Sequence, residues 1–234
     1  MTHLRTIKSF VKRSGRVTPG QQAALDNLLP EYGIKLADGV IDFAVLFGNH
    51  QPVVIEIGFG MGHSLLALAE QHPENNYLGI EVYDAGVGAL LANMQKQSLT
   101  NIRVSNQDAV EVIKQNIANE SVDGFQIFFP DPWHKKRHHK RRLIQPDFIE
   151  LLVKKLKPNG IIHLATDWQN YAEHMLAVCN DNTDLNNQSP DNTFVTRPKT
   201  RPVTKYEKRG ERLGHGVWDL LYVKKINFDY HTNL

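Results

Sequence analysis

The sequence predicts an α/β protein built on a doubly wound, mostly parallel sheet with one late antiparallel strand. From Pro52 onward, apolar runs rich in β-branched residues alternate with amphipathic stretches, which is the pattern of repeated βα units. The first run, VVIEI, is followed by the glycine-rich segment GFGMG, as expected where a strand turns into a helix. Near the C-terminus, GVWDLLYVKK alternates apolar and polar residues, which is typical of a half-exposed antiparallel strand.

The elements follow in a regular order along the chain. Residues 1–17 form a basic arm, and Thr18 with Pro19 predicts the start of a short helix through Leu29. The parallel strands are expected at residues 53–57, 76–82, 101–106, 124–129 and 160–166, and the late strand at 216–225. The helices between them are expected at residues 64–72, 86–97, 109–117, 147–156 and 168–180. Residues 181–192 are expected to form a polar surface loop.

Length and composition limit the class of protein. With 234 residues, 41% hydrophobic and 22% charged, the chain is expected to fold as one domain at residues 51–234, preceded by the arm and short helix at residues 1–50. Cys179 is the single cysteine, which excludes an internal disulfide and a cysteine-based zinc site. The sequence contains no apolar run long enough to span a bilayer and no apolar signal core. We therefore expect a cytoplasmic protein without a membrane partner, and a monomer is favoured over a homodimer.

A glycine-rich turn and three acids predict a nucleoside-containing cofactor. Gly58 and Gly60 follow the first strand, where a backbone without side chains lets a ligand approach closely. Glu81 ends the second strand 21 residues after Gly60, a distance at which a carboxylate reaches ribose hydroxyls. Glu56 lies near the end of the first strand, and Asp108 follows the third strand. The alternative is that the glycines only permit tight packing and that the acids cap helices.

The stretch FFPDPWHKKRHHKRR, residues 128–142, places an acid beside a dense positive charge. Asp131 follows the fourth strand, which lies next to the first at the ligand-binding edge of a doubly wound sheet. Pro130 and Pro132 stiffen the backbone around it, although a simple turn aspartate is the alternative. Trp133 is equally compatible with a loop anchor and with a platform for base stacking. The three His residues of this stretch lack acidic or Cys partners, so no metal site is expected.

Two clusters of positive charge predict a nucleic-acid substrate. The first consists of Lys135, Lys136, Arg137, Lys140, Arg141 and Arg142. The second extends from Arg197 to Arg212 and includes Arg201. Dense charge beside a predicted pocket indicates a phosphate-binding surface. RNA is favoured over DNA because an exposed loop base can be splayed into a pocket, whereas a duplex base must first be flipped out.

The motifs together resemble one family. EIGFGMG is similar to the first motif of class I S-adenosylmethionine methyltransferases, and FFPDPWHKKRHHKRR resembles the tRNA (guanine-N7-)-methyltransferases. GIEV, the Asp108 region, ATDW and RPVTKYEKRGERLGHGVWDL carry the resemblance over most of the chain. It implies a seven-stranded sheet, S-adenosylmethionine as the cofactor and tRNA as the partner, with the guanine in the variable loop.

The resemblance also implies roles for individual residues. The cofactor would be bound by Glu56, Gly58, Gly60, Glu81, Asp108 and Asp131, and Asp131 would act at the methyl group. The tRNA would be contacted by Lys135, Asp167, Thr204, Lys205, Tyr206 and Glu207. From the charge pattern rather than from the resemblance, we expect Arg137, Lys140, Arg141 and Arg142 to hold the RNA backbone.

Three other functions remain open on the sequence. One is a methyltransferase of similar fold that acts on an exocyclic amine of DNA or of another RNA. Another is a non-catalytic RNA-binding protein on the same scaffold. A nicotinamide-dependent dehydrogenase is less favoured, because His63 occupies the place of the third glycine in the dinucleotide-binding fingerprint.

Overall fold

The structure, a computed structural model, describes residues 9–10, 15–203, 207 and 216–226. The strands are β1 Val53–Ile57, β2 Asn76–Ile80, β3 Ile102–Ser105, β4 Val122–Phe128, β5 Leu156–Thr166, β6 Leu185–Asn187 and β7 Trp218–Lys224. The α-helices are α1 Pro19–Tyr32, α2 Phe43–Phe47, α3 His63–Gln71, α4 Asp84–Gln97, α5 Ala109–Asn116, α6 Pro146–Lys155 and α7 Gln169–Asn180. The described residues also contain two 3₁₀ helices, η1 Leu36–Asp38 and η2 Lys136–Arg141.

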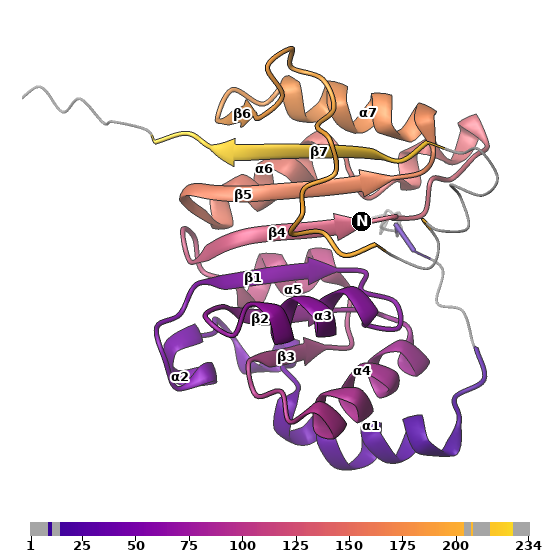
Figure 1. The fold of residues 1–234 in the computed structure, drawn as a ribbon, viewed down its shortest axis with the longest axis vertical. Helices are drawn as coiled ribbons and strands as arrows, with labels where there is room; N and C mark the ends of the chain where they lie inside the picture. The colour runs from indigo at the N-terminus through magenta and orange to yellow at the C-terminus, as the bar shows by residue number, and fades with distance from the viewer. Residues whose placement is uncertain (1–8, 11–14, 204–206, 208–215, 227–234) are drawn as a thin grey trace, which may run out of the picture.

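The seven strands form one mixed sheet in the order β3-β2-β1-β4-β5-β7-β6. Strands β1 to β5 are parallel, and β7 runs antiparallel to both β5 and β6. The arrowheads in Figure 1 show this, because β1, β4 and β5 point to the right and β7 points to the left. The predicted fold class, a mostly parallel seven-stranded sheet with a late antiparallel strand, is therefore confirmed.

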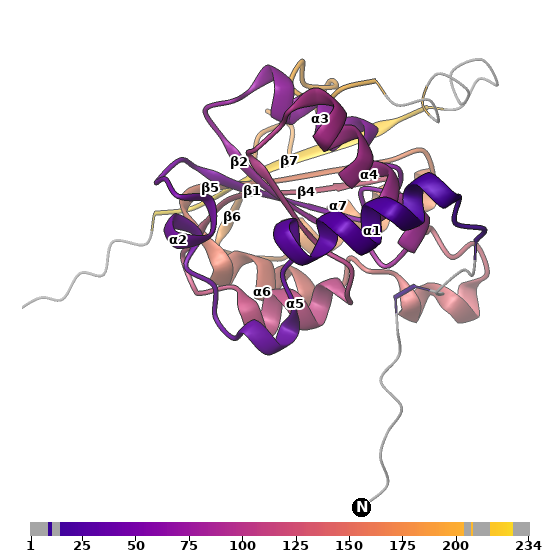
Figure 2. The ribbon, with the colours of Figure 1, turned by 90° about the horizontal axis from the view of Figure 1, so that it is seen from below.

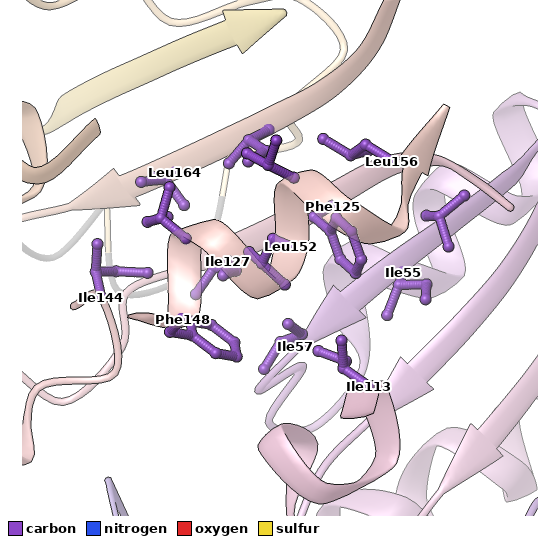
Figure 3. Close-up of a cluster of buried hydrophobic side chains, with 14 of the residues drawn as sticks. Ile55, Ile57, Ile113, Phe125, Ile127, Ile144, Phe148, Leu152, Leu156 and Leu164 are labelled. Atoms are coloured by element: carbon purple, nitrogen blue, oxygen red, sulfur yellow. The ribbon is translucent and has the colours of Figure 1, made fainter. Parts of the chain in front are cut away.

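Helices cover both faces of the sheet. Helices α3 and α4 lie on one face and α5 and α6 on the other (Figure 2). On β1 the side chains alternate, and Ile55 and Ile57 pack in the cluster that contains side chains from α5, α6 and α7. Figure 3 shows this cluster around Phe125 and Leu152. A second cluster joins α3 and α4 to α1 through Leu65, Leu90 and Ala24 among others.

The region before β1 packs as part of the same domain. Thr18 caps α1 as predicted: its hydroxyl accepts from the Gln21 amide at 3.4 Å, while the Gln21 side chain accepts from the Thr18 amide at 2.9 Å. The helix runs past the expected end at Leu29 to Tyr32. Ala24 and Phe43 are buried in the two clusters. Residues on both sides of position 50 therefore contribute to the same hydrophobic clusters.

One short strand and one short α-helix were not predicted, and neither were the two 3₁₀ helices. Strand β6 lies inside the stretch expected to be a surface loop, and α2 lies before the first predicted strand. Each has a single buried side chain, Leu185 in β6 and Phe43 in α2, so neither produces a periodic pattern in the sequence. In the part of the chain that the structure describes, no helix is both long and apolar enough to cross a membrane.

Candidate active site

The glycine-rich turn after β1 exposes its backbone at the edge where the parallel strands end. Gly58 and Gly60 have backbone φ angles of +76° and +58°. Residues other than glycine adopt such angles only with strain. A Cβ added at either residue would have no neighbour within 4 Å, so both face open space. Helix α4 packs closely against the other side of the turn. A Cβ on Gly86 of this helix would collide with the Gly60 carbonyl. The turn is thus fixed on one side and open on the other.

Glu81, just beyond β2, binds this turn directly. Its Oε2 accepts the Gly60 amide at 2.9 Å, and its Oε1 accepts the amides of Val82 and Tyr83 at 2.7 and 3.1 Å. A carboxylate offers about four acceptor sites, so one site remains for a ligand. Burial raises the pKa of Glu81 and its backbone hydrogen bonds lower it, while the charge of Asp131 raises it further. The negative charge of Asp131 is thus near enough to Glu81 to raise its pKa.

Glu56 lies on β1 beneath the turn. Its side chain is 3% exposed, and among the described residues its Oε2 has no hydrogen-bond partner. Burial, and to a smaller extent the charge of Glu81, raise its pKa to about 8. A buried carboxyl with an unused oxygen is costly unless a ligand supplies a donor or a positive charge. Together with the open glycine backbone, this site fits a cationic, nucleoside-bearing cofactor.

Asp108 occupies the position that the sequence predicted, after β3, and caps α5. Its Oδ1 accepts the Val110 amide at 3.1 Å. This is the capping role considered as the alternative from the sequence. The predicted contact of Asp108 with the cofactor stays a prediction.

The Pro130-Asp131-Pro132 turn follows β4, which pairs directly with β1. The Phe129 amide donates to the Ala165 carbonyl of β5 at 2.8 Å. Phe129 and Trp133, on either side of the turn, have φ angles of +54° and +49°. Residues with large side chains keep such backbone angles only where the surrounding structure holds them in place. The exposed Asp131 is therefore presented by a constrained segment.

Arg142 is one of the groups that hold this turn. Its Nε donates to the Pro132 carbonyl at 3.0 Å and one terminal nitrogen donates to Asn170 Oδ1 at 2.8 Å, while the guanidinium lies 4.7 Å from the centre of the Tyr171 ring. Arg142 is 3% exposed. In this structure the guanidinium is hydrogen-bonded within the protein, so burial does not support a contact with the RNA backbone. That contact stays a prediction.

Trp133 acts as an anchor of the loop. Its indole nitrogen donates to the Ser9 carbonyl at 3.1 Å, and the Arg141 guanidinium lies 4.2 Å from the ring centre. The His138 ring meets it edge-on. Of the two roles that the sequence left open, these contacts favour the anchor over base stacking.

The remaining predicted RNA contacts lie on the surface beside Asp131. Lys135, Lys136, Arg137 and Lys140 are exposed along or just before η2, and Asp167 is exposed at the end of β5. Four cations on one short segment form a surface that attracts phosphate. Thr204, Lys205 and Tyr206 lie outside the described residues. Among the residues that are described, no group of three His, Cys, Asp or Glu side chains is placed to hold a metal ion.

A buried charge network joins the second basic cluster to the sheet. Arg201 is fully buried, and its guanidinium donates to both carboxylate oxygens of Glu207 at 2.8 Å and to Asp219 of β7 at 2.6 and 2.8 Å. His163 of β5 shares Asp219 at 2.8 Å. Arg201 is therefore not part of a phosphate-binding surface. Glu207 is 3% exposed, so the structure does not support a direct contact with tRNA.

This network could not be predicted from the sequence, because its members are separated by up to 56 residues. No spacing pattern identifies such a set. A surface hollow lined by Val40, Asn49 and Lys157, among others, lies near α2 and the start of β1. It is at the opposite edge of the sheet from the acids and is not the candidate site.

Comparison with known proteins agrees with this geometry. A family described as a putative methyltransferase matches residues 50–220. The tRNA (guanine-N(7)-)-methyltransferase of Idiomarina loihiensis is 55% identical over 94% of this chain and 90% of its own length. That of Klebsiella pneumoniae is 55% identical over 94% and 92%. That of Pseudomonas aeruginosa strain UCBPP-PA14 is 54% identical over 94% and 90%.

Solved structures share the fold at low sequence identity. The 16S rRNA methyltransferase KamB superposes with a TM-score of 0.59 at 13% identity, over 80% of this chain and 95% of its own. The aminoglycoside resistance methyltransferase NpmB1 gives 0.52 at 14% identity, over 76% and 89%. These likenesses establish the fold of class I S-adenosylmethionine methyltransferases, and the much closer sequence relatives establish the family. This chain belongs to the tRNA (guanine-N7-)-methyltransferase family.

Proposed function

We propose that this protein transfers a methyl group from S-adenosylmethionine to nitrogen 7 of a guanine in the variable loop of tRNA. The observation that carries the proposal is the open glycine turn bonded to Glu81, above the buried and unpartnered Glu56 oxygen. The Asp131 turn and the exposed cations of η2 follow β4, the strand next to β1, and support the same reading. The names of relatives that are 54–56% identical support the same substrate and the same atom.

The cofactor would be held by the acids and the glycine turn. S-adenosylmethionine, when bound, supplies an electrophilic methyl group on a positively charged sulfur, and guanine N7 accepts that methyl with its lone pair. The remaining acceptor site of Glu81 suits a ribose hydroxyl, and the unused oxygen of Glu56 suits a cationic donor. Gly58 and Gly60 leave room for close approach.

Asp131 would act on charge rather than on a proton. N7 of guanine carries no hydrogen, so the reaction needs no general base at that atom. Methylation leaves a positive charge on the purine, and a carboxylate held in advance at that place stabilises it. Pro130, Pro132 and the Arg142 hydrogen bond to Pro132 hold the turn that carries Asp131.

The tRNA would lie over η2 and the end of β5. Lys135, Arg137 and Lys140 are proposed to bind its phosphates, because their side chains are exposed on one short segment. Asp167 is proposed to accept a hydrogen bond from the guanine. Thr204, Lys205 and Tyr206 keep the role that the family resemblance gives them. We also propose a cytoplasmic monomer, for which light scattering of the purified protein is the direct check of the oligomeric state.

One incubation tests the proposed function. The protein is supplied with S-adenosylmethionine labelled in its methyl group and with unmodified tRNA, and the product is digested to nucleosides. We expect the label in 7-methylguanosine. Label on an exocyclic amine would support the rival methyltransferase, and absence of labelled product with intact RNA binding would support a non-catalytic relative.

Asp131→Asn then tests the role of the acid. We expect turnover to fall by about 100-fold or more, because a preorganised charge partner is removed, while tRNA affinity changes less than about twofold. The control is Asp191→Asn, an exposed acid in the loop after β6. Equal turnover in the two variants would remove Asp131 from the chemistry.

A further inference from the structure

Trp168 combines large apolar area with exposure at the candidate site. It is 39% exposed, and among the residues that the structure describes no other Phe, Tyr or Trp is as open to solvent. Trp133 and Trp218 are both half-buried. An indole that remains in water leaves unused one of the largest contact surfaces that a side chain offers. The position of Trp168 in the fold shows which ligand this surface could contact.

The strand pairing places Trp168 and Asp131 after two neighbouring strands. In the β4–β5 register Phe128 lies opposite Ala165. Asp131 follows Phe128 by three residues, and Trp168 follows Ala165 by three. Because parallel strands end at the same edge, the acid and the indole follow neighbouring strands at the same edge of the sheet. The exposed Asp167 immediately precedes Trp168.

A ring contact with His134 shows that Trp168 borders the basic loop. Its ring centre lies 4.2 Å from that of His134, with the planes at 69°. His134 directly precedes Lys135, the residue before η2. Trp168 therefore contacts the short segment that joins the Asp131 turn to the cations of η2.

The backbone at Trp168 is fixed. Its amide donates to Thr166 Oγ1 at 3.3 Å, and its carbonyl accepts the amides of Tyr171 and Ala172 at 2.9 Å. An aromatic side chain on a fixed backbone loses little entropy when it binds a ligand. This is the kind of surface on which unpaired bases stack.

We propose that Trp168 is a substrate-binding residue whose indole stacks on the guanine that receives the methyl group. This inference rests on the proposed function and extends it to the residue that holds the base. Stacking orients the flat purine, while the neighbouring acids accept from its polar edge. The guanine becomes positively charged on methylation, and the face of an indole ring attracts a cation that lies over it. Trp168 thus favours the charged product as well as binding the substrate.

Tryptophan fluorescence tests this contact directly. Unmodified tRNA is added to the wild type, to Trp168→Phe and to Trp218→Phe, which is the matched control on β7. We expect tRNA to quench the wild type and Trp218→Phe alike, and Trp168→Phe to lose most of the change. A tRNA with an abasic site in place of the guanine should bind without the Trp168-dependent quench. If that tRNA quenches equally, the indole does not stack on the guanine.

Kinetics separate binding from a structural role. Stacking on a base is worth about 1–3 kcal/mol, so we expect Trp168→Leu to raise the KM for tRNA about tenfold. Trp168→Phe keeps a ring and should restore most of the affinity. If both variants have the wild-type KM, the proposal is wrong. It is also wrong if both lose thermal stability equally without a change in KM.

Two further outcomes distinguish this inference from the proposed function. Quenching by S-adenosylhomocysteine without RNA would place the indole on the cofactor and overturn the assignment. If the wild type yields no 7-methylguanosine, the proposed function fails. If it yields 7-methylguanosine while Trp168→Leu is unchanged in quenching and KM, only the role of Trp168 fails.

Discussion

Glu56 is the residue whose ionisation the fold changes most clearly. Its pKa rises from 4.5 to about 8 because the carboxyl is buried without a partner for Oε2. Folding therefore favours the protonated form, and the folded state loses stability as pH rises from about 4.5 to about 8. Glu56→Gln removes this titration. We expect the variant to gain stability relative to the wild type, by a few kcal/mol at pH 8 and by little near pH 5.

Urea unfolding of the cofactor-free protein between pH 5 and pH 9 measures this difference. The exposed Glu70→Gln on α3 is the control, and its difference from the wild type should stay flat with pH. If the Glu56→Gln difference is flat as well, Glu56 is ionised in the folded protein near its ordinary pKa, and the buried carboxyl is not held neutral.

The sequence could predict some site residues and not others for a physical reason. Glu81 and the glycine turn are placed by strand ends, which local pattern reveals, and the Gly60 to Glu81 hydrogen bond bears this out. Arg142 and Arg141 look alike in sequence, but only Arg142 is buried. The difference depends on Pro132 and Asn170. The tertiary neighbours of a charged side chain decide whether it is free to bind RNA or is hydrogen-bonded within the protein.

At the scale of elements, η2 has an outer and an inner set of charges. Arg137 and Lys140 are exposed, whereas the Arg142 that follows η2 is bonded to the Pro-Asp-Pro turn and to α7. The double variant Arg137→Ala with Lys140→Ala should weaken tRNA binding. It should also reduce the slope of log K against log salt by about 0.7 for each phosphate that is no longer neutralised. Arg142→Ala should leave that slope unchanged and lower kcat instead, because it releases the turn that carries Asp131.

Binding titrations at four salt concentrations and single-turnover rates measure the two effects. Arg103→Ala is a useful comparison, since its guanidinium donates to the carbonyls of Thr100 and Leu46 away from the site. A reduced slope of log K against log salt in Arg142→Ala would show that Arg142 does contact the RNA backbone.

Elements were predictable where they are long and periodic. Helix α7 begins and ends within one residue of the expected bounds, and β1 matches them. Strand β5 begins at Leu156 rather than at residue 160, since its pairing with β4 is irregular between Val122 and Gly124. Pro158 and Gly160 conceal that start in the sequence, because both residues are unfavourable in a strand.

For the whole molecule, the order of strands decides which motifs meet. The glycine turn after β1 and the acid after β4 are more than 60 residues apart in sequence, yet β1 and β4 are neighbours in the sheet. The expectation of a doubly wound sheet supplied this adjacency. No comparable rule exists for the chain between β6 and β7, so the position of Arg201 could not be predicted.

Arg201 joins parts of the chain that lie far apart in the sequence. It links Glu207 to Asp219 on β7, and Asp219 in turn binds His163 on β5. Burial raises the pKa of Asp219, but the hydrogen bonds from His163 and Arg201 outweigh it and hold that pKa below its usual value. Removing one partner from a buried ion pair leaves an uncompensated charge, so Arg201→Met should lower the free energy of unfolding by about 3–5 kcal/mol.

The triple variant Arg201→Met, Glu207→Gln, Asp219→Asn tests whether uncompensated charge causes that loss. It removes all three charges together, so we expect it to be more stable than Arg201→Met alone. Arg201→Lys should fall between the wild type and Arg201→Met, because an ammonium keeps the charge but cannot donate to both carboxylates in the same fork. Urea unfolding at pH 7 gives all four values. A triple variant no more stable than Arg201→Met would mean that lost packing around Arg201, and not unpaired charge, sets the cost.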